Sequence, residues 1–231
     1  MPSLPRQTRS TMGHPKRYSI FSQYDDGVYM TDDAWFGVTP EPIAIKIADD
    51  LLNTEENITI IIDAFCGAGG NTISFALSER WTKVISIEKD ASTLACAQNN
   101  AELYGVDPDS VTWIHGDSFE FLDKLLNSPE ELHPDLRVDI NATMVFASPP
   151  WGGPGYSTDE IFNLNNMEPY NIGKLHGAYK PFDHVLFLPR TSDLRQIAKL
   201  SPNDEKIDVV QYCMEGASKA MVAYIPGAGD S

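Results

Sequence analysis

The chain has 231 residues, of which 42% are hydrophobic and 22% charged, which is enough for one globular domain with a full core. A formal net charge of −16 argues against a long polyanion as a non-specific partner, because most RNA-binding proteins are basic. No apolar run approaches the ~20 residues of a membrane span, and the N-terminus lacks the apolar core of a secretory signal.

Three scattered cysteines, Cys66, Cys96 and Cys213, argue against a disulfide framework and indicate a reducing compartment. Cys66 lies in a glycine-rich loop, but no histidine is near it in sequence, so packing is favoured over a nucleophilic role. The five histidines are equally dispersed, and no metal site is predicted.

In chain order, a basic and polar tail over 1–17 is expected to be disordered, and 18–56 is expected to form an N-terminal helical segment. The helix of this segment starts near Pro40, and its apolar residues recur at a spacing of four. They are Ile43, Ala44, Ile47, Ala48, Leu51 and Leu52. The main domain is expected over 57–226, followed by a short tail over 227–231.

Strands and helices alternate through the main domain. Strands are expected over 58–63, 84–88, 111–115, 142–147 and 184–188, and helices over 71–79, 91–104, 119–126 and 193–200. Two closing strands, 208–214 and 220–224, read as an antiparallel pair. The pattern predicts an α/β fold with a mostly parallel sheet and helices on both faces.

Polar and glycine-rich positions follow four of these strands. The loop over 67–70, Glu88, Asp117 and Ser148 each come where a strand ends. Sheets of this type bind ligands in the crevice beyond the carboxyl ends of their strands, so these positions predict one ligand site.

The glycine loop and the acidic residues suit an adenosine cofactor. Small residues let the backbone of the loop approach a ligand, and Glu88 falls where a carboxylate receives both ribose hydroxyls. Thr72 stands where a dinucleotide-binding loop usually keeps a third glycine, which favours S-adenosylmethionine. Asp117 has two open interpretations, as an acceptor for the adenine amine or as a cap of the helix that starts at Phe119.

The motif Ser-Pro-Pro-Trp over 148–151 points to an amine substrate. Two prolines remove two backbone N–H groups and leave carbonyls, which suits a ligand that arrives with an NH₂ group. Trp151 then offers a flat surface for stacking a base, with added cation–π attraction if the base is cationic. A turn that merely ends the strand is the structural alternative.

These motifs resemble those of the trimethylguanosine synthases, a family of class I Rossmann-like methyltransferases, from about residue 18 to 224. The resemblance is carried by Arg-Tyr-Ser-Ile-Phe-Ser (17–22), Trp-Phe-Gly-Val-Thr-Pro-Glu (35–41), Asp-Ala-Phe-Cys-Gly (63–67), Asn-Asn-Ala-Glu-Leu-Tyr-Gly (99–105), Ser-Pro-Pro-Trp-Gly-Gly-Pro (148–154) and Phe-Leu-Pro-Arg (187–190). The Gly-Gly-Pro extension is the most specific part, since adenine-amine methyltransferases share only Ser-Pro-Pro-Trp.

The resemblance implies S-adenosylmethionine as cofactor and transfer of methyl groups to the N2 amine of 7-methylguanosine caps. Its implied cofactor residues are Phe36, Asp63, Gly67, Gly69, Glu88, Asp117 and Ser148. Ser148, Pro149 and Trp151 would be catalytic, and Trp151 and Arg190 would bind the cap. By the same resemblance, the partners are capped small nuclear and nucleolar RNAs with their ribonucleoproteins, and the location is the nucleus, including the nucleolus.

Two features depart from the family pattern or leave room for alternatives. Tyr29 replaces an expected basic residue near the cap phosphates, although Lys174, His176, Lys180, Arg190 and Arg195 form a local basic stretch. That stretch is either a phosphate-binding surface or ordinary solvated charge. An adenine-N6 methyltransferase and a non-catalytic cap-binding module are the alternative functions.

Overall fold

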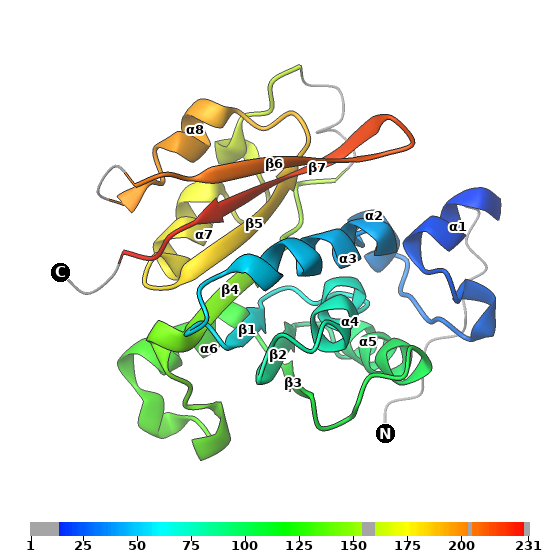
Figure 1. The fold of residues 1–231 in the computed structure, drawn as a ribbon, viewed down its shortest axis with the longest axis horizontal. Coiled ribbons are helices and arrows are strands. Elements are labelled where there is room, and N and C mark those ends of the chain that lie inside the picture. Colours follow the sequence, from blue (N-terminus) through cyan, green and yellow to red (C-terminus); the bar gives the residue numbers. More distant parts are fainter. Residues whose placement is uncertain (1–13, 154–159, 203–204, 229–231) are drawn as a thin grey trace. The chain divides into compact units, whose positions relative to one another are not determined.

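The structure, a computed structural model, describes residues 14–153, 160–202 and 205–228; for residues 14–16 and Phe36 it describes the backbone alone. The strands in this part of the chain form a seven-stranded sheet in the order β3-β2-β1-β4-β5-β7-β6 (Figure 1). The β1–β2, β2–β3 and β4–β5 pairings are parallel, and the pairings of β7 with β5 and β6 are antiparallel. This arrangement confirms the predicted mixed sheet. The chain divides into two compact units, unit 1 up to Phe121 and unit 2 from Leu122.

Unit 1 holds the cofactor motifs. Its helices and turns are α1 (His14–Ile20), η1 (Tyr24–Asp26), α2 (Ala34–Gly37), α3 (Glu41–Asp50), η2 (Leu51–Asn53), α4 (Gly70–Leu77), α5 (Ala91–Leu103) and the start of α6 (Ser118–Asn127). Its strands are β1 (Ile60–Asp63), β2 (Lys83–Glu88) and β3 (Val111–His115).

The three strands of unit 1 are parallel and in register. Ile61 and Ile62 of β1 are fully buried, as expected for a β-branched strand covered on both faces. Asp63, the last residue of β1, pairs with Ser86 of β2, and Glu88 at the end of β2 pairs with His115 of β3. The carboxyl ends of the three strands therefore lie at one edge, as the sequence predicted.

Helix α3 buries the apolar face that its spacing predicted, with one exception. Ile43, Ala44, Ile47 and Ala48 are buried, whereas Leu52 is 47% exposed. The α-helix ends at Asp50 and the chain continues as a 3₁₀ turn, η2. Because a 3₁₀ turn has three residues instead of 3.6, it rotates Leu52 off the buried face.

The N-terminal segment begins its first helix earlier than expected. Helix α1 starts at His14, so residues 14–17, which were expected in the tail, are helical. Residues 1–13, the rest of the predicted tail, lie outside the described residues, as do 229–231 of the C-terminal tail.

Unit 2 carries the Ser-Pro-Pro-Trp motif. After α6 it contains η3 (Pro129–Glu131), η4 (Pro134–Leu136), η5 (Ile140–Ala142), β4 (Thr143–Ala147), η7 (Leu164–Asn166), α7 (Ile172–Tyr179), β5 (Asp183–Pro189), α8 (Leu194–Ala198), β6 (Asp208–Met214) and β7 (Ala217–Ile225). β4 and β5 are parallel, and β5–β7 and β6–β7 are antiparallel, as predicted for the closing pair.

Helix α7 was not predicted. The Asn171 side chain caps it by accepting the Lys174 N–H at 2.9 Å, and Ile172, Leu175 and Tyr179 are buried at helical spacing. The helix is only 8 residues long and contains two glycines, which weakens its local helical signal. Packing of its apolar face stabilises it in the fold.

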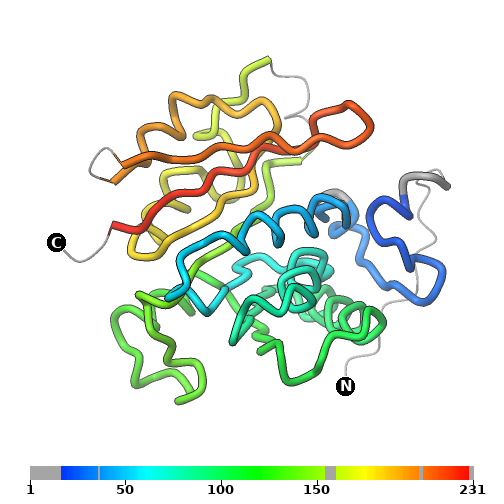
Figure 2. The backbone as a smooth tube through the Cα atoms, viewed as in Figure 1, coloured from blue at the N-terminus to red at the C-terminus, as the bar shows by residue number. Residues whose placement is uncertain are grey.

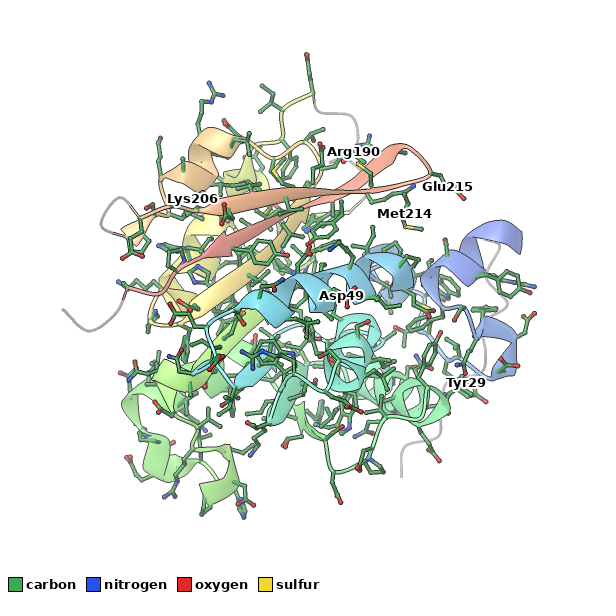
Figure 3. All side chains as sticks on the ribbon, viewed as in Figure 1. Tyr29, Asp49, Arg190, Lys206, Met214 and Glu215 are labelled. Atoms are coloured by element: carbon green, nitrogen blue, oxygen red, sulfur yellow. The ribbon has the colours of Figure 1, made fainter. Side chains whose placement is uncertain are left out.

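A two-residue turn joins β6 to β7. Glu215 and Gly216 have φ values of 51° and 75°, the left-handed conformation that tight hairpin turns require. Met214 and Glu215 lie at the tip of this hairpin (Figure 3). The turn allows β7 to begin at Ala217, three residues before the predicted start.

Among the described residues, no helix has the length and hydropathy that a membrane span requires.

Candidate functional site

In unit 1, the glycine loop after β1 is bound to the end of β2. The Cys66 N–H donates to the Ile87 carbonyl at 3.0 Å, and the Gly67 N–H donates to Glu88 Oε2 at 3.1 Å. Gly69, at φ 93°, caps the N-terminus of α4 and donates its own N–H to the Cys66 carbonyl at 2.8 Å. The backbone of the loop is therefore held in one conformation beside the Glu88 carboxylate.

The Glu88 carboxylate lies at the edge of unit 1 with acceptor capacity remaining. Oε2 accepts the Gly67 N–H, and Oε1 accepts the Asp90 N–H at 2.8 Å. A carboxylate oxygen has two lone-pair directions, so each oxygen retains one for a further donor. A ribose presents two adjacent hydroxyl donors, which matches this pair of oxygens.

Asp63 is a buried carboxyl beneath the same loop. Its Oδ2 accepts from the Thr72 hydroxyl at 2.6 Å, while Oδ1 has no hydrogen-bond partner of good geometry among the described residues. Burial raises the pKa of Asp63 to about 7 against the opposing effect of hydrogen bonds from the Thr72 hydroxyl and from the backbone N–H groups of Phe65 and Thr72. A buried carboxyl with an orphan oxygen suits a cationic or donor group of a ligand.

Asp117 caps a helix and also holds a charge partner. Its Oδ1 accepts the Phe119 N–H at 2.9 Å, which confirms the capping interpretation, and its Oδ2 pairs with Lys89 Nζ at 3.0 Å. Burial would raise the pKa of Asp117, but the Lys89 ammonium and the Phe119 N–H outweigh it, so the pKa is below its ordinary value. Phe65 and Phe119 meet edge to face beside this residue, with ring centroids 6.2 Å apart.

In unit 2, the Ser-Pro-Pro-Trp motif leaves the end of β4. Ser148 is partly exposed, Pro149 is buried and Pro150 is exposed. The two prolines present carbonyls and no N–H groups at this turn. Gly152 and Gly153 follow at φ 92° and 85°, a conformation that side-chain-bearing residues rarely adopt. The positive φ values of both positions are the reason that two glycines follow the tryptophan.

Trp151 is fixed at two points by one residue, Phe187 of β5. The two rings stack with centroids 5.6 Å apart and an interplanar angle of 18°. The Trp151 indole N–H donates to the Phe187 carbonyl at 3.2 Å. Because one indole face rests on Phe187 and the ring is only partly buried, the orientation of the opposite face is set before a base arrives.

Arg190 follows the last residue of β5 and is exposed (Figure 3). β4 and β5 run parallel, with Ala147 paired to Leu186, so the residues after both strands belong to the same edge of unit 2. Trp151 and Arg190 are thus brought to one edge of this unit.

A sequence model of the RNA cap guanine-N2 methyltransferases matches residues 58–228. The chain belongs to this family. A trimethylguanosine synthase of Schizosaccharomyces pombe is 37% identical over 210 residues, which cover 90% of this chain and 82% of the relative. A trimethylguanosine synthase of Saccharomyces cerevisiae is 36% identical over 187 residues, covering 79% of this chain and 55% of that longer protein.

Solved structures show the same fold at low sequence identity. A protein from Porphyromonas gingivalis W83 described as a methyltransferase has a TM-score of 0.65 at 16% identity, covering 93% of this chain and 48% of that chain. The METTL16 methyltransferase domain has a TM-score of 0.53 at 12% identity, covering 90% of this chain and 94% of the other. These likenesses confirm the class I methyltransferase fold.

The chain is therefore an RNA cap guanine-N2 methyltransferase, as its motifs suggested, and it shares the fold of a solved S-adenosylmethionine-dependent methyltransferase from Agrobacterium tumefaciens. The residues of unit 1 fit the cofactor, because Glu88 retains two acceptor directions and Asp63 has an orphan buried oxygen. Of the predicted cofactor residues, the structure brings Asp63, Gly67, Gly69, Glu88 and Asp117 to one edge of unit 1. Ser148 lies in unit 2, and the side chain of Phe36 is outside the described residues.

Cys66 of this methyltransferase is a packing residue. It is 5% exposed and packs with Leu94, Ala97 and Trp113. Burial, with the nearby carboxylates of Asp63 and Glu88, raises the pKa of its thiol, so the thiol stays protonated.

The predicted basic stretch does not form one surface. Within unit 2, His176 of α7 contacts His184, the second residue of β5, at 3.3 Å, whereas Arg190 follows the other end of that strand, about 20 Å away at 3.3 Å per residue. Arg195 is paired with Asp193 at 2.8 Å. These positions favour the interpretation of ordinary solvated charge, with Arg190 as the member at the strand ends.

Sequence reasoning missed two supporting residues of the methyltransferase site. Phe187 orients Trp151, and Lys89 pairs with Asp117. Phe187 lies in the Phe-Leu-Pro-Arg motif (187–190), but by residue type it is an ordinary strand residue, and a bond to its backbone carbonyl does not depend on its side chain. Lys89 directly follows Glu88 at the end of β2, and this position could have indicated that Lys89 lies at the site.

Gly69 is expected to be intolerant of a side chain. A Cβ at Gly69 would lie 3.2 Å from Ala97 Cα and 3.3 Å from the Ala97 carbonyl oxygen of α5, in addition to the strain of φ 93°. We expect Gly69→Ala to lower the free energy of unfolding by ~1–3 kcal/mol. Gly105→Ala is the matched control, because Gly105 has φ 74° but no atom within 4 Å of the added Cβ. Equal losses in denaturant titrations of the two variants would show that contact with α5 adds nothing.

Proposed function

We propose that this enzyme methylates the N2 amine of 7-methylguanosine caps of RNA to give 2,2,7-trimethylguanosine. The observation that carries the proposal is the fixed indole of Trp151, which directly follows the two prolines of the Ser-Pro-Pro-Trp motif. N7-methylation makes guanine cationic, and a cation stacks favourably on an indole face, with ~0.5–2 kcal/mol of added attraction. One short turn would thus both select the base and aim its amine.

In this proposal, the carbonyls of the 148–150 turn accept the two N–H groups of the N2 amine. Accepting both protons orients the nitrogen lone pair and returns electron density from the ring to nitrogen. S-adenosylmethionine supplies the methyl group on a positively charged sulfur. Each transfer would form one N2–CH₃ bond as the S–CH₃ bond of the bound cofactor breaks, leave a neutral thioether and release one N2 proton to water, so that two transfers would give the dimethylated amine.

The residues assigned to the cofactor and the cap would accelerate methyl transfer mainly by positioning the two reactants. Aligned reactants gain ~7–11 kcal/mol relative to reactants free in solution. For the cofactor, we assign the ribose hydroxyls to Glu88, the methionine end to Asp63 and the glycine loop, and the adenine amine to Asp117. Phe36 would close over the cofactor, and Arg190 would contact the cap phosphates.

Small nuclear and nucleolar RNAs within ribonucleoproteins of the nucleus are the proposed substrates, whose caps accept the methyl groups. The support is the similarity to two trimethylguanosine synthases. The net charge of −16 also favours a substrate recognised at its cap over one held along its length.

The test is a methylation assay with labelled S-adenosylmethionine and three oligonucleotide sets, which carry 7-methylguanosine caps, unmethylated guanosine caps or internal adenosines. We expect label only with the first set, at guanine N2 by mass spectrometry. Label on adenosine N6 would establish the adenine-N6 alternative, and cofactor-independent cap binding without label would establish the non-catalytic one.

Cofactor affinity is expected to depend on the protonation of Asp63. S-adenosylmethionine is cationic, so it binds better when the Asp63 carboxyl is ionised. Because the pKa of Asp63 is about 7 in the free protein, affinity should rise with pH up to about 7 and level off above it. Below pH 7 the slope approaches about tenfold per pH unit.

Calorimetric titrations from about pH 5.5 to about pH 8, a range that brackets the pKa of Asp63, measure the slope. Asp63→Asn keeps the shape of the side chain and removes its titration. The variant should bind more weakly at pH 8 and lose the slope. A slope of wild-type size in Asp63→Asn would assign the titration to another group.

A further inference from the structure

Within unit 1, helix α5 forms hydrogen bonds with the N-terminal segment from its first turn to its C-cap. Three residues of α5 and its C-cap contact this segment by hydrogen bonds: Thr93 to Thr31, Asn99 to Gly27, Asn100 to Tyr29, and Tyr104 to Gln23. The blue N-terminal trace passes beside this helix in Figure 2, and Tyr29 lies next to it in Figure 3. The segment includes the residues that the site assignment places over the cofactor.

Asn100 is the contact that also reaches the glycine loop. Its Oδ1 accepts the Tyr29 N–H at 2.9 Å, and its Nδ2 donates to the Tyr29 carbonyl at 2.9 Å. The same Nδ2 donates to the Ala68 carbonyl, in the middle of the glycine loop, at 2.9 Å. The side-chain amide thus pairs with the backbone of Tyr29 on one side and with the loop on the other.

The environment of Asn100 makes these bonds costly to lose. The side chain is fully buried, and the Asn99 amide donates to its Oδ1 at 3.3 Å, so both donors and both acceptor directions are occupied. Loss of the amide would leave the Ala68 carbonyl and the Tyr29 carbonyl without a partner in a buried place. The packing of Gly69 against Ala97, one turn before Asn100, holds the loop close to the same face of α5.

We propose that Asn100 is a positioning residue that couples cofactor binding to the ordering of the N-terminal segment. A ligand that holds the 67–70 loop stabilises the Ala68 carbonyl where Asn100 reaches it, and the same amide then holds Tyr29. By reciprocity, an ordered segment strengthens cofactor binding. The proposal rests on the assignment of the glycine loop and Glu88 to S-adenosylmethionine, and it deepens that assignment by joining the covering segment to it.

Hydrogen exchange of the full-length wild-type protein, with and without S-adenosylhomocysteine, is the first test. We expect the ligand to slow exchange both in the glycine loop and around Tyr29, whose N–H is bonded to Asn100. Slowing in the loop with no change around Tyr29 would overturn the coupling and leave the cofactor assignment standing. No saturable binding of S-adenosylhomocysteine at all would instead refute the cofactor assignment.

Asn100→Asp is the matched substitution for the second test. It keeps the size of the side chain, removes both donors and places a carboxylate against two carbonyl oxygens. We expect S-adenosylhomocysteine to bind about tenfold more weakly or worse, since a buried acceptor is left unpaired. The residual binding should no longer slow exchange around Tyr29, an effect that general destabilisation would not produce.

Two further variants keep the test decisive. Asn99→Ala removes a neighbouring amide that contacts Gly27 and Asn100 Oδ1 but leaves both donors of Asn100 and their bonds to Tyr29 and Ala68, so it should keep near-wild-type affinity and the coupled slowing. Asn100→Ser is smaller and neutral, and it replaces Asn100→Asp if the latter fails to fold; it should also lose the coupled slowing. Coupled slowing of wild-type size in either Asn100 variant would contradict the proposal.

Discussion

Replacing Trp151 with alanine is expected to reduce methyl transfer to a 7-methylguanosine cap to near background. Stacking of a base on an aromatic ring contributes ~1–3 kcal/mol, and that term disappears with the indole. Misorientation of the amine adds a further loss in rate, because the reaction depends on alignment. Steady-state assays with a capped oligonucleotide measure the effect. Trp151→Phe keeps a ring and should retain part of the activity.

The dependence on N7-methylation follows from the same ring. A guanosine cap without the N7 methyl group is neutral, so it lacks the cation–π attraction and should fail as a substrate of the wild-type enzyme. Phe187→Leu is an informative companion, since it removes the supporting ring but keeps the backbone carbonyl that accepts the indole N–H. We expect it to fall between wild type and Trp151→Ala. Equal rates on methylated and unmethylated caps would disprove this role for Trp151 and favour the adenine-amine alternative.

Replacing Glu88 with alanine is expected to weaken S-adenosylmethionine binding by about a hundredfold. Each hydrogen bond to a charged acceptor contributes ~1.5–3 kcal/mol, and every 1.4 kcal/mol is about tenfold in affinity. The substitution removes the acceptors proposed for both ribose hydroxyls. It also removes the acceptor of the Gly67 N–H, so the loop loses one of its anchors. Isothermal titration of the cofactor and of its demethylated product measures the change.

Glu88→Gln separates charge from shape. An amide can accept with only one of its two polar atoms, so its NH₂ group would oppose either the Gly67 N–H or the Asp90 N–H. We therefore expect a loss of affinity close to that of the alanine variant. Glu102→Gln, at an exposed position on α5, is the control for a change of net charge and should bind normally. Unchanged affinity in a folded Glu88→Ala protein would remove Glu88 from the ribose site.

Much of unit 1 was predictable because its signals are local. A strand of β-branched residues, a glycine loop and a following helix define where β1 ends and α4 begins. The carboxyl ends of parallel strands share one edge, so Asp63, Glu88 and Asp117 had to lie there once the strands were recognised. The prolines and the tryptophan of residues 148–151 likewise carry their chemistry in their side chains and in the absence of N–H groups.

The tertiary structure decided what depends on backbone groups and on packing. Asn100 bonds to backbone groups of Tyr29 and Ala68, and the Phe187 carbonyl accepts the indole N–H of Trp151. These contacts join segments far apart in sequence, and the residue types alone do not predict them. Leu52 follows the helical spacing yet is exposed, because the chain tightens into a 3₁₀ turn, and α7 forms where local propensity is weak, because its apolar face is buried. Side-chain chemistry and spacing are written along the chain, whereas the partners of a buried amide or ring exist only after the chain has folded.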